Sequence, residues 1–338
     1  MMTLPSFEFI APETIADAVK LTARHKERAK ILAGGTDLIP SMKNRLFEPD
    51  VLISLGNIPE LKQIHFDEQK GLTLGGLVSL TDVGNHPYIT EHYPVLAETA
   101  KKIATPLLQN KGTIGGNILL DTRCYYYNQS FFWRKAVNNC MKKDGDICRV
   151  APGGHRCYAI SSCDTVPVLY ALNAIIRLVS SQGERLVPLR EFYKNDGMAF
   201  NDLHPDEILT EVQIPRSPEG FRGAYIKLRR RQAIDYPMLG VMVGLVLGKD
   251  EVCIDAKIIL GAVFSCPWEV TEAQNILIGK KITEKQIEDA SAAAYETAKP
   301  MDLTNFGPAY RKRMVKVFTK RLLQMLTHQT AYTEEVLA

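Results

Sequence analysis

The spacing of apolar positions predicts a small α/β unit in the first 57 residues. Short apolar runs at 7–10, 29–32 and 51–55 are typical of strands. Between the first two runs, apolar residues recur at helical spacing, and Thr14 stands where a helix cap is expected. The second run continues directly into the sequence AGGTDL, which predicts a tight turn from a strand into another helix.

A second unit, from 58 to 220, mixes strands and helices around a stretch that is unlike the rest of the chain. A second glycine-rich turn, GTIGGN at 112–117, is followed by a cysteine-rich insertion at about 122–160. Prolines between 215 and 223 mark the end of this unit. The expected strands lie at 64–66, 71–76, 174–179, 185–189 and 208–214, and helices are expected at 93–103 and after Ser79 or Thr81.

The last part of the chain, from 221 to 330, places its strands together and its helices together. Three long strands are predicted between 224 and 263, and two amphipathic helices near 284–298 and 308–326. This order is typical of an α+β domain built on a three-stranded antiparallel sheet. The fold class predicted for the whole chain is therefore α+β with α/β elements.

Composition and charge exclude several functional classes. A net charge of +3 over 338 residues is too small to indicate binding to nucleic acid or to an anionic membrane. The longest apolar run, 238–248, has eleven residues and is too short to span a bilayer. The N-terminal residues lack the basic start and the apolar core of a signal peptide, so we expect a cytoplasmic protein.

Each glycine turn has the chemistry of a phosphate-binding loop. Adjacent glycines let the backbone approach a ligand closely, with amide groups that point at phosphate oxygens. Thr36 and Thr113 add hydroxyl groups, and a helix that begins near Asp37 would add its positive end. One such turn alone could be a connection without a ligand, but two turns about eighty residues apart favour a pyrophosphate between them. Neither turn matches GxGxxG or the P-loop pattern, which disfavours the usual nicotinamide-binding and P-loop folds.

Four of the seven cysteines lie within 34 residues, in the pattern CX15CX7CX8C. Such a cluster in a chain of this size indicates metal or redox chemistry rather than a secreted disulfide framework. The pattern has no CxxC pair, which zinc sites and ferredoxins commonly use, so the insertion must fold around what it binds. Four thiolates suit a [4Fe–4S] cluster or Zn²⁺, and free cysteines in a surface loop are the alternative. The four are Cys124, Cys140, Cys148 and Cys157, whereas Cys163, Cys253 and Cys266 lie outside the pattern.

Five motifs together carry a resemblance that covers nearly the whole chain. They are AGGTDL, GTIGGN, SSCDTVP at 161–167, VPLREFY at 187–193 and KLRRRQAIDYPM at 227–238. With them the chain resembles the FAD-binding medium subunits of the xanthine dehydrogenase and carbon monoxide dehydrogenase family of molybdenum hydroxylases. The resemblance implies a two-part FAD-binding domain followed by an α+β C-terminal domain. The insertion is most similar to that of the flavoprotein β subunits of 4-hydroxybenzoyl-CoA reductases, which implies that its four cysteines ligate a [4Fe–4S] cluster.

The resemblance also implies roles for individual residues. The two glycine turns would bind the pyrophosphate of FAD, and Asp164 stands at the position where the family has an acidic residue that binds the dinucleotide. Leu209 and Lys227 would contact the isoalloxazine ring, with Asp235 and Tyr236 close to it. Taken alone, Asp164 could instead cap a helix, Lys227 could be a solvated strand lysine and Tyr236 could belong to the core. The residues expected to bind FAD are Ala33, Gly34, Gly35, Thr36, Asp37, Leu38, Thr113, Gly115, Gly116, Asn117, Asp164, Leu209, Lys227, Asp235 and Tyr236.

The implied function is electron transfer, without substrate chemistry in this chain. A ferredoxin-like donor would supply electrons through the [4Fe–4S] cluster and FAD to a small subunit with two [2Fe–2S] clusters and a large molybdopterin subunit. The complex would be a dimer of heterotrimers in which 4-hydroxybenzoyl-CoA is reductively dehydroxylated to benzoyl-CoA. Because both glycine turns lie outside the insertion, FAD is expected to remain bound when the cluster is lost.

Two alternatives are compatible with the sequence. The chain could be the medium subunit of an ordinary hydroxylase, with zinc in the insertion and electrons passing from FAD to NAD or a quinone. It could also be a scaffold subunit whose cysteine loop is a structural zinc module. Analysis of iron, sulfide, zinc and flavin would separate these three functions.

Overall fold

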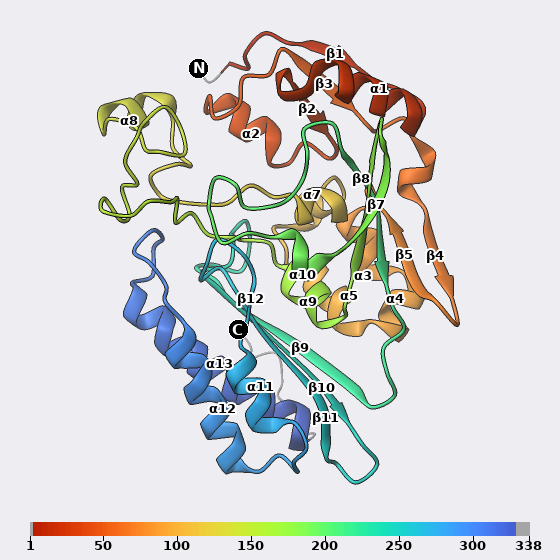
Figure 1. The fold of residues 1–338 in the computed structure, drawn as a ribbon, viewed down its shortest axis with the longest axis vertical. Coiled ribbons are helices and arrows are strands. Elements are labelled where there is room, and N and C mark those ends of the chain that lie inside the picture. Colours follow the sequence, from red (N-terminus) through yellow and green to blue (C-terminus); the bar gives the residue numbers. More distant parts are fainter. Residues whose placement is uncertain (1–2, 329–338) are drawn as a thin grey trace.

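The computed structural model describes residues 3–328, and its three sheets follow one another along the molecule (Figure 1). The first sheet is parallel and consists of β1 (Glu8–Ile10), β3 (Val51–Ser54) and β2 (Ala29–Leu32), in that order. The helices of this unit are α1 (Ile15–His25), the short 3-10 helix η1 (Lys26–Arg28) and α2 (Leu38–Lys43). The Thr14 hydroxyl accepts a hydrogen bond from the Asp17 amide and so caps α1 as predicted.

The second sheet is antiparallel and has five strands. In spatial order they are β4 (Ile64–Asp67), β5 (Gly71–Gly75), β8 (Ile208–Ile214), β6 (Ile175–Ser180) and β7 (Gly183–Pro188). All five predicted strands are present, because each carries an apolar run bounded by glycine, proline or polar residues. The helices of this unit are η2 (Pro59–Lys62), α3 (Leu80–Asn85), α4 (Pro87–His92), α5 (Pro94–Lys101), α6 (Pro106–Gln109), α7 (Ile114–Ile118), α9 (Thr165–Ala171) and α10 (Leu189–Phe192).

The C-terminal sheet has four antiparallel strands, so the prediction of three strands was wrong by one. Its order is β12 (Trp268–Glu269), β11 (Cys253–Gly261), β10 (Leu239–Leu247) and β9 (Phe221–Leu228). The additional strand β12 has two residues, too few to show any alternation of apolar and polar positions. Residues 329 and 330, the last two of the predicted C-terminal domain, lie outside the described residues.

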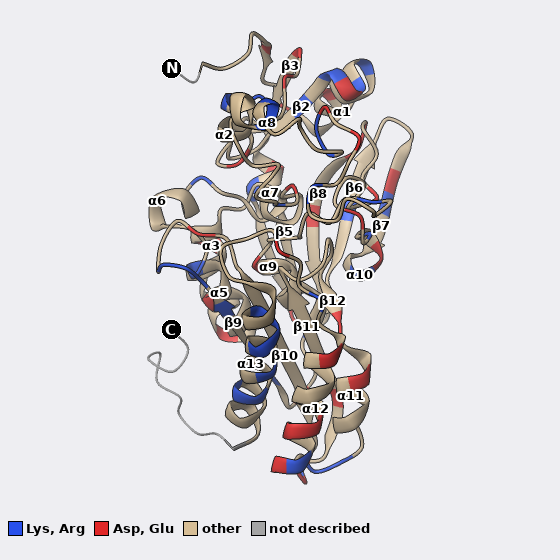
Figure 2. Cartoon of the chain, turned by 90° about the vertical axis from the view of Figure 1, so that its left-hand side faces the viewer, with Lys and Arg blue, Asp and Glu red and all other residues tan. Residues whose placement is uncertain are grey.

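Three helices cover one face of this sheet: α11 (Thr271–Leu277), α12 (Glu284–Thr297) and α13 (Pro308–His328). The last two were predicted, and α11 was not. Acidic residues on α12 face basic residues on α13, as Figure 2 shows. Glu288 pairs with Lys316 at 2.5 Å and with Lys320 at 3.0 Å. These pairs are partly exposed and add little stability, so the helices are held mainly by their apolar faces.

Strand β10 joins the C-terminal sheet to the second unit. All nine of its residues are buried, because both faces of the strand are covered. Val241 and Val243 belong to the core beneath the C-terminal helices, whereas Met242 belongs to the core of the second unit. The C-terminal domain is therefore packed against the second unit across a sheet face, with α9 lying against β10 and β11.

The cysteine insertion lies between the first unit and the C-terminal domain (Figure 1). Its only helix among the described residues is α8 (Phe131–Ala136), and the rest is irregular. Arg134 of α8 is fully buried and donates to the carbonyl oxygens of Asn44, at 2.9 Å, and Arg45, at 3.0 Å. These carbonyls directly follow α2, so the guanidinium caps the end of that helix. On the other side, the Tyr125 amide donates to the Leu303 carbonyl at 3.0 Å.

Candidate functional site

A cleft of about 750 Å³ runs between the first unit, the second unit and the loop that follows β9. It has the size and the mostly apolar lining that are typical of cofactor sites. All the residues predicted to bind FAD line it except Lys227. The fold therefore brings together residues from 33 to 236 that the sequence could connect only through a family pattern.

The two glycine turns contact one another at the floor of this cleft. A Cβ atom on Gly34 would lie 1.7 Å from the carbonyl oxygen of Lys111, just before the second turn. Gly35 has a φ of +72°, which favours glycine, and a Cβ on Gly115 would lie 2.6 Å from the Gly76 carbonyl oxygen. Gly34 is thus required for the close approach of the two turns, whereas Gly35 and Gly115 are required by the backbone within and beside each turn.

The hydroxyl groups of the two turns are placed differently. Thr113 caps α7, because its Oγ1 accepts a hydrogen bond from the Gly116 amide at 3.0 Å, and it keeps a hydroxyl proton to donate. Thr36 is exposed and lines the cleft. The helix α2 begins at Leu38, as predicted, but the Asp37 side chain does not cap it.

Asp37 instead connects three parts of the chain. Its Oδ1 atom accepts hydrogen bonds from Arg123 at 2.8 Å and from the Tyr236 hydroxyl at 3.0 Å. The Arg123 guanidinium also lies 4.2 Å from the centre of the Tyr236 ring. The sequence analysis did not identify Arg123 as a partner of Asp37 and Tyr236. In the sequence it is distinguished only by its position next to the first cysteine of the insertion. This contact orients Tyr236 at the wall of the cleft.

Asp164 and Lys227 form a buried ion pair rather than a cap and a solvated lysine. The Lys227 ammonium lies 2.9 Å from Asp164 Oδ2, and the two side chains are 2% and 4% exposed. The Tyr225 hydroxyl donates to the other oxygen of Asp164 at 2.9 Å, and no side-chain bond caps α9. Complete burial raises the pKa of Asp164, and the nearby ammonium and the hydroxyl oppose the rise. Asp164 lines the cleft, and Lys227 acts behind it.

Several residues of the cleft were missed by the sequence analysis. Asp121, Tyr127 and Lys142, from the insertion and its edge, all line it. Ser162 lines it as well, and its hydroxyl is buried without a hydrogen-bond partner among the described residues. A buried hydroxyl without a partner beside a cradle of glycines fits a ligand with polar groups, because such an atom is costly to leave unpaired.

The four cysteines of the insertion are buried, and three of them, Cys124, Cys140 and Cys157, belong to one apolar cluster. Burial raises the pKa of the Cys124 thiol to about 12 and that of Cys157 to about 11. Within residues 3–328, no three His, Cys, Asp or Glu side chains lie close enough to hold one metal ion. The predicted ligand set is thus gathered in one region without forming the shell of a single ion, and the metal site stays a prediction.

Comparison with known proteins places the chain in a family. Residues 5–217 match the family described as the FAD binding domain in molybdopterin dehydrogenase. The chain belongs to this family. Residues 223–326 match the CO dehydrogenase flavoprotein C-terminal domain. The predicted medium FAD subunit of the molybdenum hydroxylase type is confirmed, as are its fold and its place among oxidoreductase subunits.

Similar proteins extend over almost the whole of this subunit. The carbon monoxide dehydrogenase medium chain of Afipia carboxidovorans is 31% identical, over 94% of this chain and 96% of the relative. The nicotinate dehydrogenase FAD-subunit of Eubacterium barkeri is 28% identical, over 96% and 97%. The solved carbon monoxide dehydrogenase from Hydrogenophaga pseudoflava matches with a TM-score of 0.81 and 26% identity, over 97% of this chain and all of that one. No helix in the described part of the subunit is both long and apolar enough to cross a membrane.

Proposed function

We propose that the cleft binds one FAD without a covalent bond, with its pyrophosphate between the two glycine turns. The contact between Gly34 and the second turn supports this, because it makes a continuous backbone floor from two distant segments. The buried Ser162 hydroxyl, which has no partner in the described structure, supports a polar ligand in the same cleft. The residues that would hold FAD are those of the two turns, with Asp164, Leu209, Asp235 and Tyr236 along the cleft and Lys227 behind Asp164.

We further propose that the four cysteines of the insertion hold a [4Fe–4S] cluster. The donor set is chemically suitable, since it consists of buried thiols in a segment that has one short helix. A cubane holds its four thiolates at separate corners, so they need not converge as the ligands of one ion do. When bound, FAD exchanges electrons singly or in pairs and an iron–sulfur cluster exchanges them singly.

The function that these features support best is electron transfer within a molybdenum enzyme of the 4-hydroxybenzoyl-CoA reductase type. The observation that carries this proposal is the four-cysteine insertion packed directly against the flavin cleft. The chain would act with a large molybdopterin subunit and a small subunit with two [2Fe–2S] clusters, in a dimer of heterotrimers. A ferredoxin-like donor would approach the insertion, which exposes Tyr125, Phe131, Phe132 and Ile147 at the surface.

Metal and flavin analysis of anaerobically purified protein tests the cofactors. We expect one FAD and four iron and four sulfide per chain. Single Cys→Ser variants at 124, 140, 148 and 157 should lose iron and sulfide. The same change at Cys163, Cys253 or Cys266 should leave iron and sulfide unchanged, since these three lie outside the insertion. Full iron in the Cys148→Ser variant, or lost iron in the Cys163→Ser variant, would overturn the assignment of ligands.

Activity measurements test the reaction. The isolated chain should not convert 4-hydroxybenzoyl-CoA, because it carries no substrate chemistry of its own. Benzoyl-CoA should form when the molybdenum and [2Fe–2S] subunits and a reduced one-electron donor are added. Turnover by the isolated chain, or no turnover by the assembled complex, would contradict the proposal.

A second function is favoured by the names of the relatives. They are subunits of carbon monoxide, nicotinate and aldehyde-oxidising enzymes, so this chain would serve a hydroxylase that passes electrons outward to NAD or a quinone. The insertion would then contain zinc, and analysis would find zinc together with FAD. Zinc without flavin would instead indicate a scaffold subunit. A scaffold function would leave the cleft without a role.

A further inference from the structure

Lys142, from the middle of the cysteine insertion, reaches the wall of the flavin cleft. Its side chain is 7% exposed, and its ammonium lies 2.6 Å from Asp121 Oδ1 and 2.9 Å from the Gly197 carbonyl oxygen. The ammonium also donates to the hydroxyl and carbonyl oxygens of Thr122. Every proton of the ammonium therefore has an acceptor, which fixes the side chain in one position.

Aromatic groups complete the surroundings of this ammonium. It lies 4.4 Å from the centre of the Tyr127 ring and 5.7 Å from that of Phe200. The Tyr127 hydroxyl donates to the second oxygen of Asp121 at 2.8 Å. Asp121, Tyr127, Lys142 and Phe200 all line the cleft. One charged network thus forms both a part of the insertion and a part of the cleft wall.

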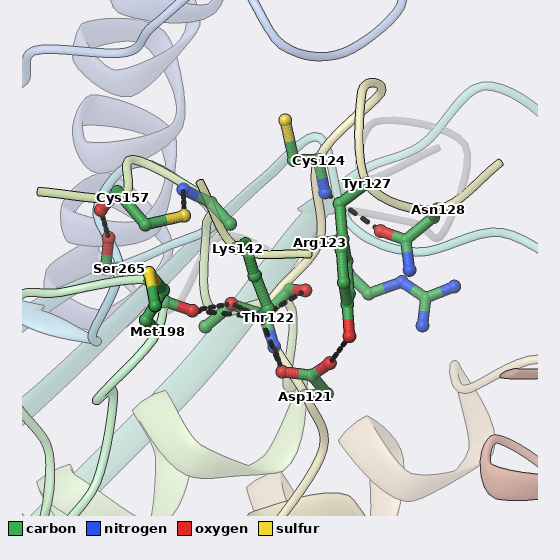
Figure 3. A network of polar contacts seen from close by, with 12 residues as sticks. Asp121, Thr122, Arg123, Cys124, Tyr127, Asn128, Lys142, Cys157, Met198 and Ser265 are labelled. Carbon is green, nitrogen blue, oxygen red and sulfur yellow. Dashed lines mark hydrogen bonds and ion pairs between the residues drawn. The ribbon is translucent and has the colours of Figure 1, made fainter. Parts of the chain in front are cut away.

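The same network lies near the cysteines, and Figure 3 draws the bonds of Lys142 to Asp121 and Thr122. Lys142 follows Cys140 by two residues. Gly197, an acceptor for Lys142, donates its amide to the Cys157 carbonyl at 2.9 Å. A Cβ atom on Gly197 would lie 2.7 Å from Cys157 Sγ, so the two are in close contact. These contacts give a path from Cys157 to Lys142 through Gly197, and the chain itself joins Cys140 to Lys142.

We propose that Lys142 is a positioning residue that couples order in the cysteine insertion to the affinity of the cleft for FAD. When the insertion loosens, Lys142 leaves Asp121, and a partly buried carboxylate in the cleft wall loses its cationic partner. This inference rests on the proposed function and reverses one expectation from the sequence. FAD affinity falls when the insertion loses its metal, although both glycine turns lie outside the insertion.

The test compares FAD dissociation constants of iron-loaded and iron-free full-length protein, measured by flavin fluorescence. In the unmodified chain, removal of iron should weaken FAD binding about 10-fold, within the usual range for coupled sites. Lys142→Met should weaken it to a similar extent with iron present and should show little further loss when iron is removed. Lys143→Met is the matched control, because its ammonium lies 3.5 Å from Asp144 and does not line the cleft. It should behave as the unmodified chain does.

The outcomes separate this inference from the function on which it rests. A Lys142→Met variant with unchanged FAD affinity, or a Lys143→Met variant with the same loss, would overturn the coupling. An unmodified chain that binds no FAD would overturn both. If the unmodified chain contains no iron, or if removal of iron leaves its FAD affinity unchanged, the coupling fails while FAD binding in the cleft stands. Should Lys142→Met not fold, Asp121→Asn takes its place, because it removes the same ion pair from the other side.

Discussion

Replacement of Lys227 by methionine should be among the most damaging single changes near the cleft. Methionine has a similar length but no charge, so the change removes three donated hydrogen bonds. The ammonium bonds Asp164 Oδ2 at 2.9 Å, the Asp235 carbonyl at 3.1 Å and the Lys102 carbonyl at 3.2 Å. Among the described residues, the Asp164 carboxylate would keep only the Tyr225 hydroxyl as a side-chain donor.

The loss of folding free energy follows from burial, since the side chains of Lys227 and Asp164 are 2% and 4% exposed. Removal of one partner from a buried ion pair costs about 3–5 kcal/mol, because it leaves the other charge uncompensated. Such a loss lowers the midpoint of thermal unfolding by several degrees or more. Lys257→Met, on strand β11 of the same sheet, is the control. Its ammonium lies 3.6 Å from Glu269 and 3.7 Å from Asp255, and its loss should cost about 1 kcal/mol or less.

The effect of Lys227→Met should also depend on pH, with a definite sign. Burial already raises the pKa of Asp164 above its ordinary value of 3.8, and loss of the ammonium raises it further. At pH values between the ordinary pKa of the unfolded chain and the raised pKa of the folded variant, Asp164 of the folded variant binds a proton that the unfolded chain has released. Stability of the variant therefore falls as pH rises from about 4 through the raised pKa. The variant should be closer to the unmodified chain at about pH 5 than at about pH 7.5.

Urea unfolding of the full chain, followed by circular dichroism at both pH values, measures these free energies. A loss no larger than that of Lys257→Met would refute the argument from burial. A larger deficit at the lower pH would refute the assignment of the uncompensated charge to Asp164.

Three further predictions concern the cleft and the insertion. Gly34→Ala should force the two glycine turns apart and abolish FAD retention, measured as flavin per protein. Gly153→Ala is the control and should retain FAD, because a Cβ atom at Gly153 would meet nothing within 4 Å. Arg134→Met should leave the carbonyls after α2 without their donor and should therefore release the insertion. The release should be measurable as rapid proteolysis within 122–160. Lys135→Met, at an exposed position, is the control and should not cause this proteolysis. Tyr236→Phe removes one hydrogen bond to Asp37 and should weaken FAD binding only about 2- to 10-fold. A larger loss of FAD affinity would contradict the view that this hydroxyl only orients the ring.

The longer strands and the longer helices of this protein could be predicted from local patterns. The run that predicts a strand within 238–248 is β10, because nine consecutive apolar residues suit a strand covered on both faces. The sequence could not show what covers each face. Met242 and Val243 differ only by one position in the chain, yet they belong to different cores.

The elements that were missed are short or irregular. The two residues of β12 and the six of α8 are too few for a periodic signal to stand out. Arg134 of α8 was visible only as one basic residue among several in the insertion. Its complete burial depends on carbonyl groups at residues 44 and 45, which lie about ninety positions earlier.

The sequence by itself determined the longer strands and helices, the two glycine turns and the presence of a cysteine insertion. Each of these follows from residues that are neighbours in the chain, where spacing is visible. Only the tertiary structure decided that Gly34 meets Lys111, that Asp37 receives both Arg123 and Tyr236, and that Lys142 joins the insertion to the cleft. The reason is physical: most of these contacts join residues from about 75 to 200 positions apart, and such pairs leave no periodic trace in the chain.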